Sequence, residues 1–411
     1  MKNQNTLILS FFFLNLHLAT TKAGFSVGGS VGVGVGVGSG VVWVGGGSNS
    51  NHNQNQNQNP KSYESPISKM DSAFSALQAW KSSITDDPLK ILDSWVGSNV
   101  CSYKGIFCSN PENGNAMSSS SAESASLVVA GIDLNHANLQ GTLVKELSLL
   151  TDISILHLNS NRFSGTVPET FKDLVFLQEL DLSNNQLSGL LPQELFNKNL
   201  DAIFINNNQF EGEIPTNLGN SPASVINLAN NKLSGNIPAS FGFMGSKIKE
   251  ILFLNNQLTG CIPEGVGLFT EMEVLDVSFN SLMGHLPDTL SCLQNIEVLN
   301  LAHNQLSGEL SDIVCSLRSL ANLTVAYNFF SGFSQQCSKL FFRNVGFDFS
   351  LNCIPGRNMQ RPHPECSMIP GGSLSCFRIP TPKPLICGSM SVSNSKNTDS
   401  TSESHSQTQS P

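Results

Sequence analysis

The sequence predicts an α/β repeat fold: a right-handed solenoid of about nine to ten repeats of roughly 24 residues, closed at each end by a disulfide-bonded cap. The first observation behind this prediction is a motif that recurs at a regular period between residues 132 and 332. The second is the placement of the ten cysteines, of which two precede the repeats and five follow them. The third is an apolar N-terminal run typical of a secreted chain, in which such disulfides form.

Composition narrows the classes of function. The chain has 411 residues, of which 13% are charged, about half of the usual level of roughly 25%. This fraction disfavours both a typical cytosolic enzyme and a charge-rich disordered chain. Residues 127–337 carry eight Lys and Arg against twenty Asp and Glu, whereas residues 338–411 carry seven against four. Nucleic-acid binding needs clustered basic residues and is therefore disfavoured, so a basic ligand is the better expectation.

The N-terminus indicates the compartment. An apolar run from Leu7 to Leu18 follows Lys2, and small residues before Gly24 provide a cleavage site. A run of about a dozen apolar residues is too short to span a bilayer and is typical of a signal peptide, here residues 1–23. No later stretch reaches the roughly 18 apolar residues of a membrane helix, and the polar C-terminus carries no glycolipid-anchor signal. The sequence therefore predicts release from the cell.

Residues 24–64 are expected to form a disordered spacer. Gly and Val alternate up to Gly47, and Asn and Gln alternate up to Asn59. Such segments cannot bury enough apolar surface to offset the entropy of ordering. A glycine fingerprint for dinucleotides is disfavoured because no strand-helix-strand unit follows, so no cofactor is expected.

Residues 65–126 are expected to form an N-terminal helical cap. Ser65 followed by Pro66 is typical of a helix start. The apolar residues that follow share one helical face: Met70, Phe74, Leu77 and Trp80. Further along, Cys101 and Cys108 predict a small disulfide loop. Helix and loop together would cover the open end of an apolar stack.

Residues 127–336 contain the repeats. Copies such as LHLNSNRFSGTVP and LDLSNNQLSGLLP place an Asn at intervals of 24, 23, 23, 25, 24, 24 and 24 residues from Asn161 to Asn328. Apolar residues occupy every second position, as at Leu156 and Leu158, which is the alternation of a strand. Both side chains would then point into a shared core. The Asn turns inward to pair backbone groups, Gly allows the bend, and the Pro begins an outer segment. This pattern is that of a leucine-rich repeat, with Ala137 replacing Asn in an earlier copy.

The last part of the chain is expected to form a Cys-rich cap over residues 337–388 and a disordered polar tail over residues 389–411. Cys315 and Cys337 lie nearly one repeat apart and are the best long-range disulfide pair. Four cysteines behind the repeats can pair in three ways: Cys353, Cys366, Cys376 and Cys387. Zinc binding is disfavoured because no CxxC or HxxxH spacing occurs, so no metal is expected.

The concave side of the curved stack is the expected binding surface, because solenoids bind extended ligands there. A strip of exposed apolar residues indicates a contact surface, and neighbouring carboxylates would attract a basic peptide. The alternatives are that neighbours shield the apolar residues and that the acidic residues only keep the protein soluble. The apolar members expected to face solvent are Phe204, Leu252, Leu254, Phe279 and Tyr327. The other candidate ligand-binding residues are Glu179, Asp181, Glu250, Asp276 and His303.

Catalysis finds no support in the sequence. No HExxH or phosphate-cradling loop occurs, and GxSxG is matched only inside the Gly-rich spacer, at residues 24–28 and 28–32, where no flanking strand and helix are expected. His157 lies one repeat before Asp181, but a solvated strand face explains this pair better than acid–base chemistry does. We therefore expect a binding protein rather than an enzyme.

One modification site is predicted. Asn322-Leu323-Thr324 is the only clear N-glycosylation sequon. Because Leu323 would point inward, Asn322 would point outward near the end of the groove. A glycan there would limit where a ligand can lie.

The motif LxLxxNxLSGxIP resembles the plant-specific subclass of leucine-rich repeats, and the residues around Trp95 resemble the N-terminal cap of those proteins. Later segments, above all NLTVAYNFFSG and FDFSLNCIPGRNMQRPHPEC, resemble the leucine-rich repeat extensin-like proteins of plants. The match runs from about residue 60 to residue 387. Members usually continue into Ser-Pro-rich extensin repeats, whereas this chain ends in a polar tail. It therefore resembles the short relatives that lack the extensin domain.

A second departure from the family concerns the cysteines. Relatives often carry a Cys at the position of Asn236, where it would pair with the residue at the Cys261 position. The resemblance therefore implies that Cys261 is left unpaired. Cys292 lies too far round the coil to bridge it without distortion. An unpaired Cys would allow the chain to form a homodimer.

Three functions stay open. The resemblance implies a secreted protein of the plant cell wall that binds small, basic, Cys-rich peptides of the rapid alkalinization factor type and tunes wall formation or integrity. The acidic repeats agree with such a partner. An inhibitor of polygalacturonases would also use a concave face. A structural wall protein that adheres to pectin is the third, although the net charge of −12 in residues 127–337 would repel an acidic polysaccharide.

Overall fold

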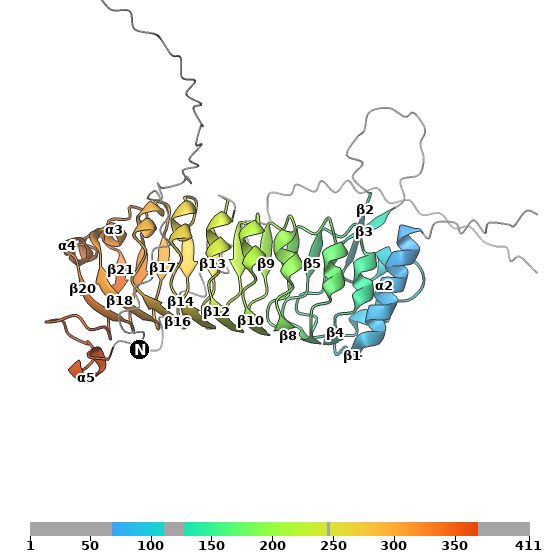
Figure 1. The fold of residues 1–411 in the computed structure, drawn as a ribbon. Helices are drawn as coiled ribbons and strands as arrows, with labels where there is room; N and C mark the ends of the chain where they lie inside the picture. The colour runs from blue at the N-terminus through green and yellow to red at the C-terminus, as the bar shows by residue number, and fades with distance from the viewer. Residues whose placement is uncertain (1–67, 111–126, 245–246, 369–411) are drawn as a thin grey trace, which may run out of the picture. The chain divides into compact units, whose positions relative to one another are not determined.

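The computed structural model describes residues 68–110, 127–244 and 247–368. The chain divides into two units, residues 1–64 and 65–411, and every described residue belongs to the second. The predicted signal peptide, spacer and polar tail lie outside the described residues, as do Cys376 and Cys387. Within the described part the predicted solenoid is confirmed, because each repeat adds one strand to each of two sheets and the repeats stack in a row (Figure 1).

One sheet, here called the inner sheet, has eleven strands in the described residues and carries the predicted ligand-binding positions. Its strands are parallel except for the antiparallel pair β2 and β3. The register aligns equivalent positions of neighbouring repeats, so that Leu156 pairs with Leu180 and His157 with Asp181. The strands are β2 (Ile106–Ser109), β3 (Val128–Asp133), β5 (Ile155–His157), β7 (Glu179–Asp181), β9 (Ala202–Phe204), β11 (Val225–Asn227), β13 (Glu250–Leu252), β15 (Val274–Asp276), β17 (Val298–Asn300), β19 (Asn322–Thr324) and β21 (Gly346–Asp348).

The second sheet has ten strands in the described residues and follows the turn of each repeat. Its strands are parallel except for the antiparallel pair β1 and β4. Gly141 of β4 contacts the backbone of the cap so closely that an added Cβ would lie 2.5 Å from the carbonyl oxygen of Ser83. The strands are β1 (Ile84–Asp86), β4 (Gln140–Thr142), β6 (Arg162–Gly165), β8 (Gln186–Leu190), β10 (Gln209–Glu213), β12 (Lys232–Asn236), β14 (Gln257–Gly260), β16 (Ser281–Gly284), β18 (Gln305–Leu310) and β20 (Phe329–Phe333).

The remaining segment of each repeat forms a short helix. From η4 to η9 the residue before the helix is Pro in extended conformation, which ends the preceding strand and fixes the direction of entry. None of the helices in the described residues is long and apolar enough to cross a membrane. The helices of the repeats and the C-terminal cap are η3 (Lys145–Leu149), η4 (Glu169–Asp173), η5 (Gln193–Asn197), η6 (Thr216–Asn220), η7 (Ala239–Phe243), η8 (Glu264–Leu268), η9 (Asp288–Cys292), α3 (Asp312–Cys315), α4 (Gln335–Ser338), η10 (Phe341–Arg343) and α5 (His363–Cys366).

The N-terminal cap consists of α2 (Lys69–Ser83), η1 (Ile91–Ser94), η2 (Val100–Ser102) and the strand β2. The helix begins later than predicted. Its N-cap is Ser68 rather than Ser65, because the Ser68 hydroxyl accepts a hydrogen bond from the Asp71 N–H at 3.1 Å. The predicted apolar face is confirmed, with Leu77 and Trp80 buried.

The predicted column of inward-facing Asn residues is confirmed. Asn328 is 0% exposed, and its amide donates to the carbonyl oxygens of Leu301, Val325 and Ala326. Its Oδ1 accepts from the backbone N–H of Leu306 in the preceding repeat at 2.9 Å. The same four contacts recur in the other repeats, so the column pairs backbone groups that the turns leave open.

The disulfides of the described residues confirm two predicted bonds, Cys101 with Cys108 and Cys315 with Cys337, decide one pairing that the sequence left open, and overturn one expectation. Cys101 bonds to Cys108, and the other two bonds join Cys315 with Cys337 and Cys353 with Cys366. The expectation that Cys261 is left unpaired is wrong, because Cys261 and Cys292 are both disulfide-bonded. That expectation rested on the missing Cys at position 236 and on the distance judged for Cys292, and Asn236 instead faces the hydroxyl of Thr259 at 3.3 Å. No described cysteine is free to link two copies of the chain.

Candidate functional site: the solvent face of the inner sheet

The predicted ligand-binding residues lie on the solvent face of the inner sheet. In each repeat two strand residues flank a buried one, as Glu179 and Asp181 flank Leu180, and two further residues follow the strand. Glu179, Phe279 and Tyr327 are exposed. The half-buried members are Asp181, Phe204, Glu250, Leu254, Asp276 and His303.

Leu252 departs from the prediction. It was expected to face solvent, but it is only 7% exposed, so that expectation is wrong. Leu252 lies in register between Asn227 and Asp276 on the adjacent strands. Side chains directly opposite each other on neighbouring strands lie about 5 Å apart, close enough to shield an apolar group between them.

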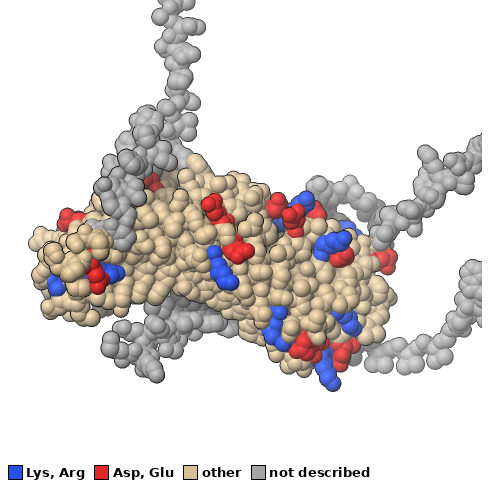
Figure 2. Space-filling view, turned by 60° about the horizontal axis from the view of Figure 1, so that its bottom comes forward, with Lys and Arg blue, Asp and Glu red and all other residues tan. Residues whose placement is uncertain are grey.

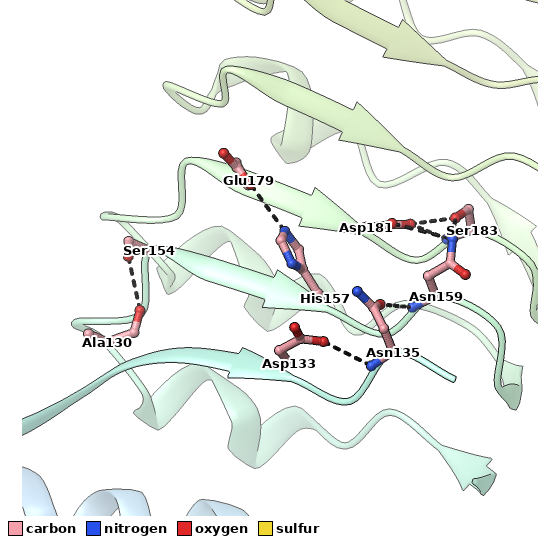
Figure 3. Close-up of polar contacts among 9 residues, drawn as sticks. All are labelled: Ala130, Asp133, Asn135, Ser154, His157, Asn159, Glu179, Asp181 and Ser183. Atoms are coloured by element: carbon pink, nitrogen blue, oxygen red, sulfur yellow. Dashed lines mark hydrogen bonds and ion pairs between the residues drawn. The ribbon is translucent and has the colours of Figure 1, made fainter. Parts of the chain in front are cut away.

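The N-terminal part of this face carries three carboxylates and a His that we call the polar half: Asp133, His157, Glu179 and Asp181. Figure 3 shows the imidazole of His157 directed at the carboxylate of Glu179, with 3.1 Å between Nε2 and Oε2. Asp181 Oδ1 accepts the N–H of Ser183 at 2.9 Å, and Asp133 Oδ1 accepts the N–H of Asn135 at 3.0 Å. Three carboxylates therefore share one surface with the imidazole of His157.

Burial lowers the pKa of His157, but the hydrogen bond to Glu179 and the negative charges of Glu179, Asp181 and Asp133 outweigh it, so the pKa is raised above its ordinary value of 6.5. The same hydrogen bond lowers the pKa of Glu179. A raised pKa in the folded state means that the ion pair stabilises the protein below the ordinary His pKa and that this stabilisation is lost as pH rises through the folded-state pKa.

We expect the pKa values of His157 and His303 on the inner-sheet face to be shifted in opposite directions. Burial and then the positive charge of Arg361 lower the pKa of His303, whereas that of His157 is raised. An NMR pH titration of the imidazole protons should therefore show His157 titrating above His303. Replacing Glu179 with Gln should bring the pKa of His157 down and leave that of His303 unchanged. Equal pKa values for the two residues would contradict this assignment of charges.

The C-terminal part of the face is less charged and more apolar. Burial raises the pKa of Asp276, although hydrogen bonds from Ser278 and Asn300 act to lower it. The pKa of Glu250 is also raised, first by burial and then by the negative charge of Glu273. The positions beside them carry small or apolar side chains such as Ala302 and Ala326. Asp276 and Glu250 thus ionise less readily than ordinary carboxyl groups, whereas the pKa of Glu179 in the polar half is lowered.

A stack of three rings borders this apolar part, and we call Phe279, His303 and Tyr327 the aromatic ladder. The ring centroids of Phe279 and His303 are 4.0 Å apart, and those of His303 and Tyr327 are 3.9 Å apart. The planes deviate from parallel by 13° and 14°. Phe279 is 49% exposed and Tyr327 is 40% exposed. The sequence placed these residues on the face, and the structure brings them into one continuous surface.

Sequence reasoning missed the side chains that continue the ladder in the other direction. The ladder occupies the position directly before the buried Asn of each repeat, which we call the turn column. Four earlier repeats carry Asn in this column, and their amides form a hydrogen-bonded chain with distances of 2.7, 2.6 and 2.8 Å. These residues are Asn184, Asn207, Asn230 and Asn255. The recurrence of the NN pair in the motif was the signal that could have identified them.

Arg361 is a second residue that sequence reasoning did not assign to the site. Its guanidinium lies over the ring of Phe329, 4.4 Å from the centroid, and its Nε donates to the carbonyl oxygen of Asn328 at 2.8 Å. Arg361 also pairs with Glu365 at 3.0 Å. The C-terminal loop thus places a positive group at the end of the aromatic ladder, which no periodic motif predicts.

Asn322 lies on β19, half-buried on the same face. Its Oδ1 accepts a hydrogen bond from Thr324 at 3.0 Å, which joins the two polar residues of the sequon. The strand position beside it is Gly346, where an added Cβ would lie 3.3 Å from the Asn322 amide. Glycosylation of Asn322 stays a prediction.

The surface of the second sheet contrasts with the inner-sheet face. Figure 2 shows that charged side chains are sparse over much of the face that carries the second sheet and gather toward the N-terminal end. Glu211 and Glu213 of β10 are exposed on this sheet. They have the same charge as the carboxylates of the polar half but lie on a different sheet, which makes them suitable control positions.

Comparison with known families identifies the repeats. Residues 70–109 match the family described as leucine rich repeat N-terminal domain. Residues 151–210 match the family described as leucine rich repeat, and so do residues 224–244, 271–293 and 295–317. These matches confirm the predicted repeat type and the cap that precedes it.

Two relatives from Arabidopsis thaliana illustrate the similarity. The chain is 44% identical over 234 residues to leucine-rich repeat extensin-like protein 6, and the aligned region covers 51% of this chain and 48% of the relative. It is 43% identical over 341 residues to leucine-rich repeat extensin-like protein 2, and this aligned region covers 77% of this chain and 42% of the relative. The chain thus spans about half of the length of the relatives that it matches.

Solved structures of plant receptor ectodomains are also similar. The ectodomain of the Arabidopsis thaliana receptor kinase GASSHO1/SCHENGEN3, in complex with CASPARIAN STRIP INTEGRITY FACTOR 2, is 27% identical with a TM-score of 0.62, covering 69% of this chain and 32% of that chain. The Arabidopsis receptor kinase HAESA, in complex with the peptide hormone IDA and a co-receptor, is 28% identical with a TM-score of 0.50, covering 62% of this chain and 46% of that chain. The plant-type leucine-rich repeat fold is thereby confirmed.

Proposed function

We propose that this chain, which is a relative of the leucine-rich repeat extensin-like proteins of plants, binds a basic peptide on the solvent face of its inner sheet. The observation that carries the proposal is the arrangement of that face, in which the carboxylates of the polar half lie on the same sheet as the exposed aromatic ladder. Charge attracts and orients a basic partner, and apolar contacts hold it. The complex of the receptor kinase HAESA with the peptide hormone IDA supports this use of the fold.

The finer proposal names the partner and the place. The resemblance to the extensin-like proteins implies a small, basic, Cys-rich peptide of the rapid alkalinization factor type. It also implies action in the plant cell wall, where such binding would tune wall formation or integrity. The predicted signal peptide and the disulfides of both caps support an extracellular location. The proposal requires binding alone and assigns no catalytic step to the chain.

Neutralising the carboxylates of the inner-sheet face tests the proposal. We expect a variant with Glu179→Gln and Glu250→Gln to bind a rapid alkalinization factor peptide at least about tenfold more weakly than the parent, because each lost charge removes attraction. The measurement is a calorimetric titration of the full secreted chain at low and moderate salt. Affinity of the parent should fall as salt rises, since screening weakens exposed charges.

The matched control is Glu211→Gln with Glu213→Gln on the second sheet. It changes the net charge by the same amount and leaves the inner-sheet face intact. Equal weakening in both double variants would show a nonspecific charge effect. Absence of binding to every basic peptide of this type would refute the proposed function, and a wall polysaccharide would then be the partner to test.

A further inference from the structure

The aromatic ladder occupies backbone positions that aromatic residues ordinarily avoid. Phe279, His303 and Tyr327 have φ angles of 53°, 55° and 57°, in the left-handed region. That region favours Gly and Asn and is rarely occupied by bulky residues, for which it costs about 1–2 kcal/mol per residue. The same column carries Asn in the four preceding repeats. Phe279 and Tyr327 are therefore not the residues that the fold itself would select at these positions, whereas His, like Asn, is enriched in this region.

Stacking of the three rings on one another offsets only part of the free-energy cost of the left-handed backbone. Aromatic pairs in favourable geometry contribute about 0.5–1.5 kcal/mol each, and the ladder has two such pairs. Phe279 and Tyr327 still expose 49% and 40% of their surface. Strained residues that also keep apolar surface in water cluster at ligand-binding positions.

The geometry of the stack selects the kind of partner. Because the rings lie face to face, the His303 faces are covered by its two neighbours. The surface that the ladder offers is a row of ring edges, which carry the positive side of the ring quadrupole and suit edge-to-face contact with another aromatic ring. A sugar ring packs against a free aromatic face, and the middle of this ladder offers none. The ladder thus favours an apolar or aromatic side chain over a polysaccharide.

We propose that the aromatic ladder is the anchoring site for one aromatic side chain of the bound peptide, whose basic residues then lie over the polar half. This inference rests on the proposed function and adds the identity and spacing of the peptide's contacts. Four strand spacings separate β7, which carries Glu179 and Asp181, from β15 in the repeat of Phe279. At about 4.8 Å per strand this is about 19 Å, which an extended peptide spans with about six residues.

The amide chain of the turn column supports this direction. Asn184, Asn207, Asn230 and Asn255 fill the column between the polar half and the ladder. Burial and Arg361 hold the pKa of His303 low, which keeps the middle ring neutral near pH 7 and the ladder apolar.

Synthetic peptides with one variable anchor test the inference. The probes are fluorescein-labelled peptides that contain a Lys-Arg pair, a Gly-Ser spacer of two, six or ten residues and a final Phe or Ala. Binding to the full chain is measured by fluorescence anisotropy. With the six-residue spacer we expect the Phe peptide to bind at least about tenfold more tightly than the Ala peptide, and the gain should shrink with the other spacers.

Protein variants separate the ladder from the rest of the face. Phe279→Asn combined with Tyr327→Asn introduces the residue that the column uses elsewhere, so we expect the fold to be retained and the preference for Phe to fall to about twofold or less. Tyr327→Phe keeps the ring and should keep the preference. Asn207→Ala, in the same column outside the ladder, is the matched control and should also keep it.

The outcomes distinguish the two proposals. Equal binding of the Phe and Ala peptides would overturn the ladder inference and leave the proposed function standing. Failure of every basic peptide to bind would overturn both. Binding of oligogalacturonides that is lost in the Asn double variant would also overturn the inference, because the ladder would then be a carbohydrate site.

Discussion

Replacing Asn328 with Ala is expected to lower the free energy of unfolding by about 4 kcal/mol, because it leaves several buried backbone groups unpaired at once. The amide of Asn328 pairs three carbonyl oxygens, and its Oδ1 pairs the N–H of Leu306 in the preceding repeat. The side chain is 0% exposed, so water cannot replace it without opening the stack. Urea unfolding of the full chain, followed by circular dichroism, measures the loss.

The control for this substitution is Asn255→Ala. Asn255 is an exposed Asn of the turn column that donates one hydrogen bond, to Asn230 at 2.8 Å. Its loss is expected to cost about 1 kcal/mol, because water can replace the bond and only the left-handed backbone preference is lost. Equal destabilisation by the two substitutions would show that buried pairing is not what the inner Asn column contributes. Ala137, which occupies the Asn position of the first repeat, lies in the repeat whose strands β3 and β4 pair with the cap strands β2 and β1.

The repeats were predictable because each position is repeated under the same physical constraint. The buried Leu and Asn columns, the turn glycines and the bonds between Cys101 and Cys108 and between Cys315 and Cys337 all follow from local spacing. The start of the cap helix was misplaced by three residues, since Ser65 and Ser68 are both acceptable N-caps. Only the geometry shows that the Ser68 hydroxyl accepts from the Asp71 N–H.

The sequence predicted which repeat positions belong to the candidate site, but not which of their side chains are exposed or touch one another. Whether Leu252 is exposed depends on the side chains of the neighbouring strands, which a motif does not encode. The contact of Phe279 with His303 was likewise invisible, because residues 24 positions apart meet only when the repeats stack. Arg361 reaches the ladder from a loop outside the repeats, so periodicity gave no indication of it. Non-periodic contacts between repeats are therefore what the structure adds.

Replacing Trp95 with Ala is expected to destabilise the N-terminal cap by about 3–5 kcal/mol, the usual cost of removing a buried large aromatic side chain. Trp95 is 1% exposed, stacks on Tyr103 with ring centroids 5.5 Å apart and lies 5.9 Å from Trp80. Its indole N–H donates to the carbonyl oxygen of Lys104 at 3.1 Å. Hydrogen exchange of the full chain should show faster exchange in the cap and the first repeats than in the distant repeats, because solenoid stability is carried by contacts between neighbours.

The same substitution should weaken basic-peptide binding, since the cap is connected to the polar half. Lys104 precedes Gly105, whose carbonyl oxygen accepts the N–H of Asp133 at 2.9 Å. Loosening this loop frees the strand that positions Asp133 beside His157. Tyr103→Phe is the control, because it keeps the ring stack and removes only the hydroxyl, which donates to Gly97 at 2.6 Å. Normal exchange in the first repeats of the Trp95→Ala variant would contradict the connection, because the cap would then be stabilised independently of the polar half.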